Sequence, residues 1–514
     1  MSNYLWIVIT GGFFSFFASM GIGANDVANS FATSIGAKSL TIKQAVVIAC
    51  IFETSGAILM GSHVSETIRK GIADYECFQD DPYTLMYGNM WVCFSVAIWL
   101  FTASYFEMPV STTHSCIGGM IGMTIAIKGP NCVIWYKSLD TFPFVGGVSG
   151  MVISWFISPL LSGIISSTIF LLIRTLILRK KYEDKYILCG FPILVGITIL
   201  FNTFFIVYKG SKGIGLDKTP FEIVLLVSFG ISLFSCLIIT PILPKLYHYI
   251  NNKFKNIESD NINKIINHKK ILSITYNIDN TKTIIYNDKT FCLTTNDDII
   301  IGNDSNDNNI KINNNDTQDT QDTLVNIIHN NAEVFDVRTE EFFKYLQIFS
   351  ASCAAFSHGA NDVSNAIGPF VAILTIYIEN DVRKDNVMNE NAYWILTLGG
   401  IGISIGLIIY GYKIIQVMGT KLCKITPSRG AIIELSAALV TILGSRLKIP
   451  LSTTHCQIGA TCGVGLLESS WKNNISGINK NIVYKVLFGW IITCIFVGFT
   501  TGVLTAQGIY SPSL

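Results

Sequence analysis

The chain has 514 residues, of which half are hydrophobic and 14% are charged, and its formal net charge is +1. Soluble proteins usually contain about a quarter charged residues, so this deficit indicates a lipid environment rather than water. The near-neutral charge gives no sign of the excess of basic residues that is typical of a protein with a nucleic-acid partner.

Apolar runs long enough to cross a bilayer recur along the chain. A hydrocarbon core about 30 Å thick needs roughly 20 helical residues, so the runs predict about 10–12 membrane segments, counting re-entrant ones. The first run lacks the basic flank of a secretory signal, and we expect it to remain as a span. Pro159 lies in an unusually long run, which it could divide into two spans. In chain order the runs lie near Tyr4–Met20, Ala45–Met60, Met90–Tyr105, Phe144–Ile173, Tyr186–Tyr208, Ile223–Ile242, Phe342–Ala355, Trp394–Tyr412, Ala431–Leu443 and Ile482–Leu504.

The stretch from about Asn251 to Asp336 differs from the rest of the chain, because it is dense in asparagine and aspartate. Such a composition buries too little apolar surface to offset the entropy lost on ordering, so we expect a disordered hydrophilic loop. Two short basic stretches, RKKYEDK and KLYHYINNKFK, lie at the ends of neighbouring spans. Positive residues at such places favour the cytosol, where we therefore place the loop.

Thirteen cysteines are spread through the chain, most of them inside apolar runs. They lack the short, regular spacing of a disulfide framework or a zinc site. We interpret them as small apolar side chains that fill space between helices.

Two polar motifs each occur twice in the chain. GANDVAN at Gly23–Asn29 returns as GANDVSN at Gly359–Asn365, which is 336 residues later. PVSTTH at Pro109–His114 returns as PLSTTH at Pro450–His455, which is 341 residues later. Similar offsets in the same order indicate two homologous halves, a feature of many secondary transporters.

A weaker match, Trp155 with Trp490 at an offset of 335 residues, supports the same division of the chain. The polar loop and two further apolar runs lie between the two halves. The predicted parts are a first transporter repeat at 1–173, additional spans at 174–248, the disordered cytosolic loop at 249–341 and a second repeat at 342–514.

The GANDV motifs place carboxylates and amides inside apolar runs. A carboxylate within a membrane is costly unless it is paired or hydrated. Small residues around each motif allow a helix to break, and the exposed backbone groups, with carboxylate and amide oxygens, suit a hard cation such as sodium. A polar cluster that only joins helices is the alternative, but two equivalent copies favour function. The candidate cation-coupling residues are Asp26, Asn29, Asp362 and Asn365.

The STTH motifs predict an oxyanion site. Proline before each motif favours a helix start, where three hydroxyls, unpaired N–H groups and the helix dipole all attract an anion. Ordinary capping of a helix by serine is the alternative. His114 and His455 end the motifs, and each either orients the hydroxyls or binds a proton or substrate. The candidate anion-binding residues are Ser111, Thr112, Thr113, Ser452, Thr453 and Thr454.

Two further carboxylates, Glu53 and Glu434, lie in apolar runs at positions that are not equivalent in the two halves. An intramembrane carboxylate is a functional residue by default, so we assign both to ion coupling, with structural hydrogen bonding as the alternative. His358 precedes the second GANDV motif only, where Ile22 occupies the first, and it stays unassigned.

These motifs contain four carboxylates with no lysine or arginine among them, and an oxyanion would add more negative charge. Gathering such charges in a medium of low dielectric constant is prohibitive without counter-charge. Anion binding should therefore require the binding of cations or protons, which is the thermodynamic condition for symport.

At these residues the sequence resembles the inorganic phosphate transporter (PiT) family, and the resemblance covers both membrane halves. It implies an all-α polytopic membrane protein of two inverted repeats with broken or re-entrant helices, which imports inorganic phosphate with sodium or, in some members, with protons. It also implies that Asn25 and Asn361 bind phosphate with the two Ser-Thr-Thr hairpins, and that Asp26 and Asp362 bind sodium. The two membrane glutamates match those of the family in their unequal placement.

The resemblance implies no cofactor beyond co-transported sodium, and we expect the plasma membrane as the location and a homodimer as one form of assembly. A passive anion channel would share the hydroxyl donors but would not need the buried carboxylates. An intramembrane hydrolase could use Ser111 and His114, which share a helix face, but it would not explain two copies of the pair. We therefore expect a transporter with alternating access rather than an enzyme, and the choice between sodium and protons stays open.

Overall fold

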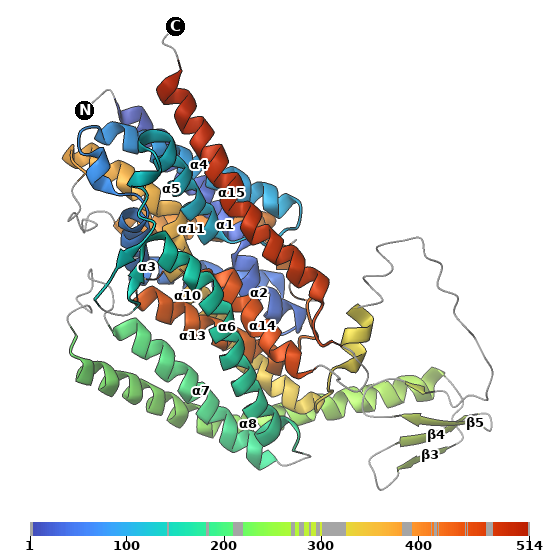
Figure 1. Cartoon of the computed structure of the whole chain (residues 1–514). Coiled ribbons are helices and arrows are strands. Elements are labelled where there is room, and N and C mark those ends of the chain that lie inside the picture. The colour runs from blue at the N-terminus through green and yellow to red at the C-terminus, as the bar shows by residue number, and fades with distance from the viewer. Residues whose placement is uncertain are drawn as a thin grey trace, which may run out of the picture. The chain divides into compact units, whose positions relative to one another are not determined.

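The structure is a computed structural model, and helices dominate the part of the chain that it describes (Figure 1). The described residues are 4–140, 143–180, 184–208, 219–268, 273–276, 282–286, 289–293, 299–300, 325–382, 393–412, 414–415, 419, 421–447, 449, 451–468 and 476–511.

The first half of the chain forms six long or medium helices with short turns between them. The helices are α1 (Leu5–Asn25), α2 (Val27–Gly36), α3 (Ile42–Gly71), α4 (Pro82–Tyr105), α5 (Thr112–Lys128) and α6 (Gly147–Ile173). The short elements are η2 (Tyr75–Phe78), η3 (Pro130–Cys132), η4 (Arg174–Leu178) and the antiparallel strands β1 (Lys137–Ser138) and β2 (Val145–Gly146).

Two long helices and a small sheet come next, and the second half follows them. The helices are α7 (Asp184–Val207), α8 (Phe221–His268), α10 (Val337–Glu379), α11 (Tyr393–Tyr410), α13 (Pro427–Arg446), α14 (Thr453–Leu467) and α15 (Lys480–Tyr510). The sheet contains β3 (Ser273–Tyr276), β4 (Lys282–Tyr286), β5 (Lys289–Leu293) and β6 (Ile299–Ile300), which pair in that order and antiparallel.

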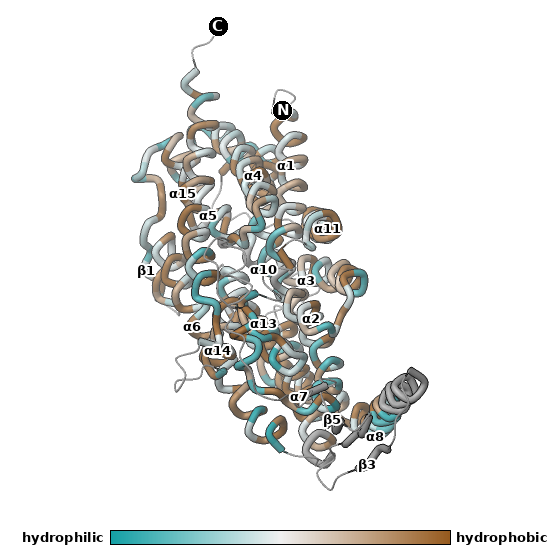
Figure 2. The backbone as a smooth tube through the Cα atoms, turned by 90° about the vertical axis from the view of Figure 1, so that its right-hand side faces the viewer, coloured by the Kyte–Doolittle hydropathy of each residue, from teal (hydrophilic) through white to brown (hydrophobic). Residues whose placement is uncertain are grey.

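The helices have the length and surface of membrane spans. Among the described residues, seven helical stretches are long and apolar enough to cross a bilayer. Large apolar side chains point outward from them, and Phe156, Leu226 and Phe499 are each more than 70% exposed. Hydrophilic residues instead gather along α10 and α13 among hydrophobic neighbours (Figure 2). The prediction of an all-α polytopic membrane protein is confirmed.

Helix breaks were expected at Pro159 and at both GANDV motifs, and only the first GANDV motif has one. Pro159 does not divide its run, because α6 continues through it as one helix. The first GANDV motif does interrupt a helix, since α1 ends at Asn25 and α2 begins at Val27. The second motif lies inside the uninterrupted helix α10, where its polar side chains are satisfied by neighbouring helices rather than by a break.

The open end of the α4–α5 hairpin, opposite the turn that joins the two helices, contains a disulfide bond between Cys77 and Cys132. The interpretation of the cysteines as spacers is therefore wrong for this pair. The two cysteines are 55 residues apart in sequence, so no local spacing marks them. They meet because η2 precedes α4 and η3 follows α5, and the backbone of Asp74 also donates to Cys132.

The two halves exchange packing partners. Helix α6 of the first half packs on α14 of the second, and α15 of the second packs on α5 of the first. Helices α3 and α10, and likewise α11 and α1, form a second exchanged pair. A side chain at Gly23 would collide with the carbonyl oxygen of Ile403, and one at Gly359 would collide with that of Glu53. Glycine at these equivalent positions thus permits the same close helix contact in both halves.

The hairpins α4–α5 and α13–α14 meet at their tips. The α4–α5 hairpin has its base at the disulfide, whereas the α13–α14 hairpin has its base at a buried ion pair, Arg429 with Glu468, whose closest atoms are 2.8 Å apart. Figure 1 shows the first hairpin in the upper part of the bundle and the second in the lower part. We call these two ends of the bundle the disulfide end and the Arg429 end.

The Arg429 end also joins α6 to the segment that precedes α10. Arg179 makes two hydrogen bonds of 2.8 Å with Glu333, and these bonds lower the pKa of Glu333. The backbone N–H of Glu333 donates to Glu468, which connects this pair to the ion pair of Arg429. This end of the bundle is therefore rich in charge, unlike the membrane-spanning stretches.

Residues Pro241–Gln321 form a compact unit of their own, apart from the unit made by the rest of the chain. Within it, α8 continues to His268 and the strands β3 to β6 follow. A disordered loop was predicted for 249–341, whereas the structure has a helix and four strands in part of this range. Residues 301–324 of that loop lie outside the described residues, and the four-part division of the chain stays a prediction.

Candidate functional site

The STTH motifs form the tips of the two hairpins. Ser111 is the N-cap of α5, where its hydroxyl accepts the N–H of His114 at 3.3 Å, and Ser452 caps α14 by the same bond to His455. The capping expected as the alternative role is therefore present in both halves. A hydroxyl that accepts a bond still has its own proton to donate, so capping does not prevent anion binding.

The asparagines of the GANDV motifs hold these tips in place. Asn25 donates to the carbonyl of Met108 at 2.9 Å and accepts from the N–H of Val110 at 3.0 Å. Asn361 donates to the carbonyl of Leu451 at 2.7 Å. The amides thus position the hydroxyl-bearing segments, and their direct binding of phosphate stays a prediction.

The two motif aspartates lie together between the tips. The Thr112 hydroxyl is 2.9 Å from Asp26 Oδ2 and 3.2 Å from Asp362 Oδ1, so it can donate its proton to either carboxylate. Thr453 donates to Asp362 Oδ2 at 2.5 Å, and the Asn365 amide donates to Asp362 Oδ1 at 2.7 Å. The hydroxyls predicted to bind an anion and the carboxylates predicted to bind cations therefore form one buried cluster.

The second threonine of each motif crosses to the opposite half. Thr454 donates to Asp26 Oδ1 at 2.6 Å and lies 3.3 Å from the carbonyl of Val110. Thr113 lies 3.5 Å from Asp362 Oδ1 and donates to the carbonyl of Leu451 at 3.0 Å. Equivalent residues thus make reciprocal contacts across the interface of the two halves.

His358 joins this cluster, although sequence reasoning left it unassigned. Its Nδ1 lies 2.8 Å from Glu53 Oε2, and its Nε2 lies 3.1 Å from Asp362 Oδ2. Asp26, His358 and Asp362 together have ligand atoms close enough to surround one metal ion. The spacing of His358 four residues before Asp362 was an available signal, because residues four apart share a helix face.

Glu434 lies in a separate cage of donors between α2, α10 and α13. Its Oε1 accepts from the hydroxyls of Thr33 at 2.6 Å and Ser34 at 2.5 Å, and from the Gln347 amide at 3.3 Å. Its Oε2 accepts from Ser350 at 2.6 Å. The structure thus brings Glu53 to the aspartates through His358, but it gives Glu434 other partners.

The histidines of the two STTH motifs lie on aromatic rings. The ring of His455 stacks on Trp490 with centroids 3.4 Å apart, and the ring of His114 lies 3.7 Å from that of Trp155. His455 Nδ1 also lies 2.9 Å from the Trp155 carbonyl oxygen. These contacts support the orienting role that was one of two expectations for the histidines.

One predicted residue cannot be placed in this arrangement. The side chain of Asn29 lies outside the described residues, so its predicted role in cation coupling is not addressed by the contacts above.

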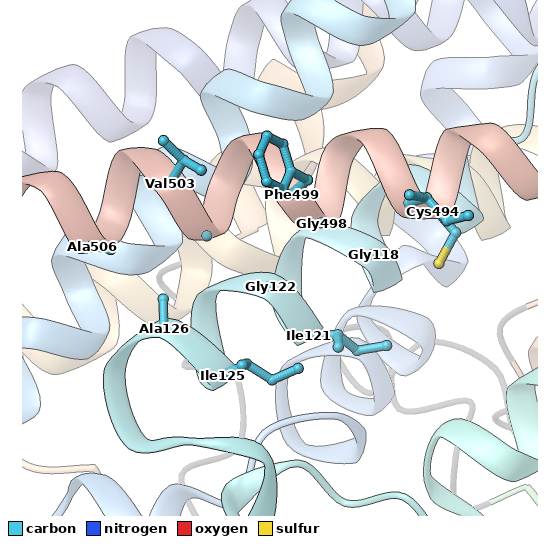
Figure 3. Close-up of a pocket in the computed structure, with 12 residues that line it drawn as sticks. Gly118, Ile121, Gly122, Ile125, Ala126, Cys494, Gly498, Phe499, Val503 and Ala506 are labelled. Atoms are coloured by element: carbon cyan, nitrogen blue, oxygen red, sulfur yellow. The ribbon is translucent and has the colours of Figure 1, made fainter.

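A groove of about 550 Å³ lies elsewhere, between α5 and α15 (Figure 3). Its walls are glycines and apolar side chains such as Ile121, Ile125 and Phe499. A groove without charged or hydroxyl side chains offers nothing to bind an oxyanion or a cation, so the buried cluster remains the candidate site.

Comparisons with known proteins cover nearly the whole chain. The model of the phosphate transporter family matches residues 22–501. The sodium-dependent phosphate transporter 1 of Rattus norvegicus is 28% identical over 98% of this chain and 95% of its own length, and that of Xenopus tropicalis is 28% identical over 99% and 96%. A solved structure, "The sodium-dependent phosphate transporter", matches with a TM-score of 0.72 and 29% identity over 98% of this chain and all of its own.

Proposed function

The chain belongs to the phosphate transporter family, and we propose that it imports inorganic phosphate across the plasma membrane by sodium symport with alternating access. The single observation that carries this proposal is the shared cluster of Asp26, Asp362 and the threonine hydroxyls. The Thr112 hydroxyl contacts both carboxylates, and Thr453 and Thr454 contact one each, so an anion that takes these protons must lie within a few ångströms of two carboxylates.

Electrostatics then couples the two substrates. Asp26, Asp362 and Glu53 are all at most 1% exposed, and the imidazole of His358 lies between Glu53 and Asp362. Even with a protonated imidazole, three carboxylates leave net negative charge in a medium of low dielectric constant, where a phosphate ion would be repelled. Sodium ions on these oxygens remove that repulsion, so phosphate binds only after or together with sodium.

The sodium ligands proposed for this step are oxygens of Asp26 and Asp362, with Asn29 and Asn365 as amide ligands. Phosphate is proposed to bind the hydroxyls of the two Ser-Thr-Thr tips and the N-termini of α5 and α14, where the helix dipoles favour an anion. Alternating access is supported by the two hairpins, which come from opposite ends of the bundle and meet at the site. This arrangement supports, in turn, an inverted relation between the two halves.

The orientation in the membrane follows from two independent features. Disulfides persist in oxidising compartments, so the Cys77–Cys132 end is proposed to face the outside. The opposite end of α6 leads into Arg179 and Lys180, and positive residues near span ends favour the cytosol. Both features place the Arg429 end in the cytosol.

The transport proposal is tested with radiolabelled phosphate in vesicles that contain the protein. We expect phosphate to accumulate above equilibrium only when an inward sodium gradient is present, at fixed pH. A pH gradient without sodium provides the control for proton coupling. Equilibration that is independent of both gradients would show a passive anion channel instead.

The hydroxyl role of Ser111 can be separated from its capping role. Glycine caps a helix within a few tenths of a kcal/mol of serine, whereas alanine costs about 1 kcal/mol. If the hydroxyl binds phosphate, Ser111→Gly and Ser111→Ala both raise the phosphate concentration for half-maximal uptake several-fold and change sodium affinity less. An effect of the alanine variant alone, measured by the same uptake assay, would identify Ser111 as a cap only.

The proposed orientation is tested with epitope tags. A tag inserted after Asp140, which is exposed near the disulfide end, should bind antibody on intact cells. A tag inserted within 301–320 should bind antibody only after the cells are permeabilised. The reverse pattern would show that the Arg429 end faces outside.

A further inference from the structure

A small cavity adjoins the candidate site on the side of the Arg429 end. Its volume is about 20 Å³, and its polar walls are Ser30 of α2, His358 of α10, Thr441 of α13, and Thr453 and Gln457 of α14. A space of this size holds one water-sized atom. The cavity is therefore large enough for a single oxygen, but not for a whole phosphate ion.

Gln457 contributes a buried donor to this cavity. The residue is 5% exposed, and within the described part of the chain its Nε2 has no hydrogen-bond partner. Leaving a buried amide donor unpaired costs about 1–3 kcal/mol, so such a group is normally matched by an acceptor at some stage of function. The donor points to an acceptor such as an oxygen atom as the occupant of the cavity.

The cavity is continuous with the site through shared residues. Thr453 and His358 line it, and both also contact Asp362 Oδ2, at 2.5 Å and 3.1 Å. A ligand oxygen that leaves the Thr453 hydroxyl in this direction thus enters the cavity next. There Gln457 is a neutral donor, which attracts an anionic oxygen without adding a charge that would trap it.

Most of the polar lining of this cavity is not repeated in the other half of the molecule. The repeat relation equates Ser30 with Ala366, His358 with Ile22, Thr441 with Leu100 and Gln457 with Cys116. All four counterparts are buried and at most 1% exposed. Of the five polar residues that line the cavity, only Thr453 therefore has a counterpart with a strong hydrogen-bonding group, which is Thr112.

The same asymmetry continues beyond the cavity. The cage of Glu434 lies between α2, α10 and α13, and its donors are Thr33, Ser34, Ser350 and Gln347. The repeat relation equates these donors, in the same order, with Pro369, Phe370, Phe14 and Gly11, and Glu434 with Cys93. Polar groups thus extend from the site toward the Arg429 end, whereas the equivalent positions toward the disulfide end are apolar.

We propose that Gln457 binds one oxygen of phosphate as the ion leaves the central site toward the Arg429 end, the cytosolic end in the orientation proposed above. This proposal rests on phosphate transport as the function. The amide replaces the hydrogen bond that the leaving oxygen gives up, and it makes the cytosol-facing binding state chemically different from the outward-facing one. Gln457 is therefore a phosphate-binding residue for one face of the membrane.

The test compares Gln457→Leu and Gln457→Glu with the unsubstituted protein from both sides of the membrane. Uptake of radiolabelled phosphate by intact cells measures binding from outside, and uptake by inside-out vesicles from the same cells measures binding from the cytosolic face. Loss of one hydrogen bond to a charged group is expected to raise the half-maximal phosphate concentration at the cytosolic face about tenfold. The half-maximal phosphate concentration at the outer face should change less than about twofold, which is less than the loss of even one neutral hydrogen bond would cause.

The glutamate variant keeps the shape of glutamine but removes the donors and adds an acceptor, so its effect should exceed that of leucine. Gln507→Leu, at an exposed position on α15, is the matched control and should change neither value. Equal changes at both faces, or no change at either face with both variants, would overturn the proposal; the second result would mean that the cavity holds water only. Absence of sodium-driven uptake by the unsubstituted protein would instead reject the function itself.

Discussion

Asp362→Asn is expected to abolish sodium-driven phosphate uptake while the protein still reaches the membrane. Asparagine keeps the shape of aspartate, but it removes the charge that faces His358 and accepts from Thr453 and Asn365. Removing one partner from a buried charged pair typically costs about 3–5 kcal/mol, which corresponds to a loss of a hundredfold or more. Radiolabelled phosphate uptake against a sodium titration measures the effect.

The reciprocal contacts across the two halves add a sharper requirement to this test. Asp26→Asn should have the same effect, because Asp26 accepts from Thr112 and Thr454 as Asp362 accepts from Thr453. Asp140→Asn, at an exposed position, is the control and should leave uptake unchanged. Normal sodium dependence in both motif variants would remove the aspartates from the cation site.

Glu434→Gln is expected to raise the sodium concentration for half-maximal uptake about tenfold. The carboxylate accepts from four donors through two oxygens, whereas an amide accepts only through its carbonyl oxygen, so the donors that face its NH₂ group lose their acceptor. The loss of bonds to a charged group accounts for a change of this size. Sodium activation curves at saturating phosphate measure it.

The alternative, a purely structural glutamate, makes a different prediction. In that case the variant would lower the thermal stability of the purified protein but leave the sodium activation curve of the surviving molecules unchanged. Glu222→Gln, which is exposed at the start of α8, serves as the control for both measurements. Thermal stability and the sodium activation curve together therefore distinguish a role of Glu434 in ion coupling from a purely structural role.

Much of the candidate site follows from patterns that can be read along one chain. Repeated motifs at nearly equal offsets predict that the GANDV and STTH segments are equivalent, and the structure brings them together at one interface. The prediction that Glu53 and Glu434 are not repeat equivalents agrees with the close approaches of Gly359 and Gly23, which pair Glu53 with Ile403 instead. Such inferences succeed because a repeat constrains position, whatever the details of packing.

Other features depended on which segments the fold brings into contact. His358 lacks a counterpart in the first half, so repeat reasoning set it aside, yet it bridges Glu53 and Asp362. Cys77 and Cys132 carry no local signal and meet only because α4 and α5 form a hairpin. The expected helix break occurs at Asp26 but not within α10. The two motifs have nearly the same residues, so local composition does not decide whether the helix breaks.

The sequence by itself determined the solvent, the class of fold and the chemistry of the site, because hydropathy, repeated motifs and intramembrane carboxylates are properties of residue order. Only the tertiary structure decided that hydroxyls of one half serve the carboxylate of the other, and that polar groups extend from the site toward one end alone. Those relations depend on distances between side chains from separate helices, and packing rather than sequence spacing sets these distances.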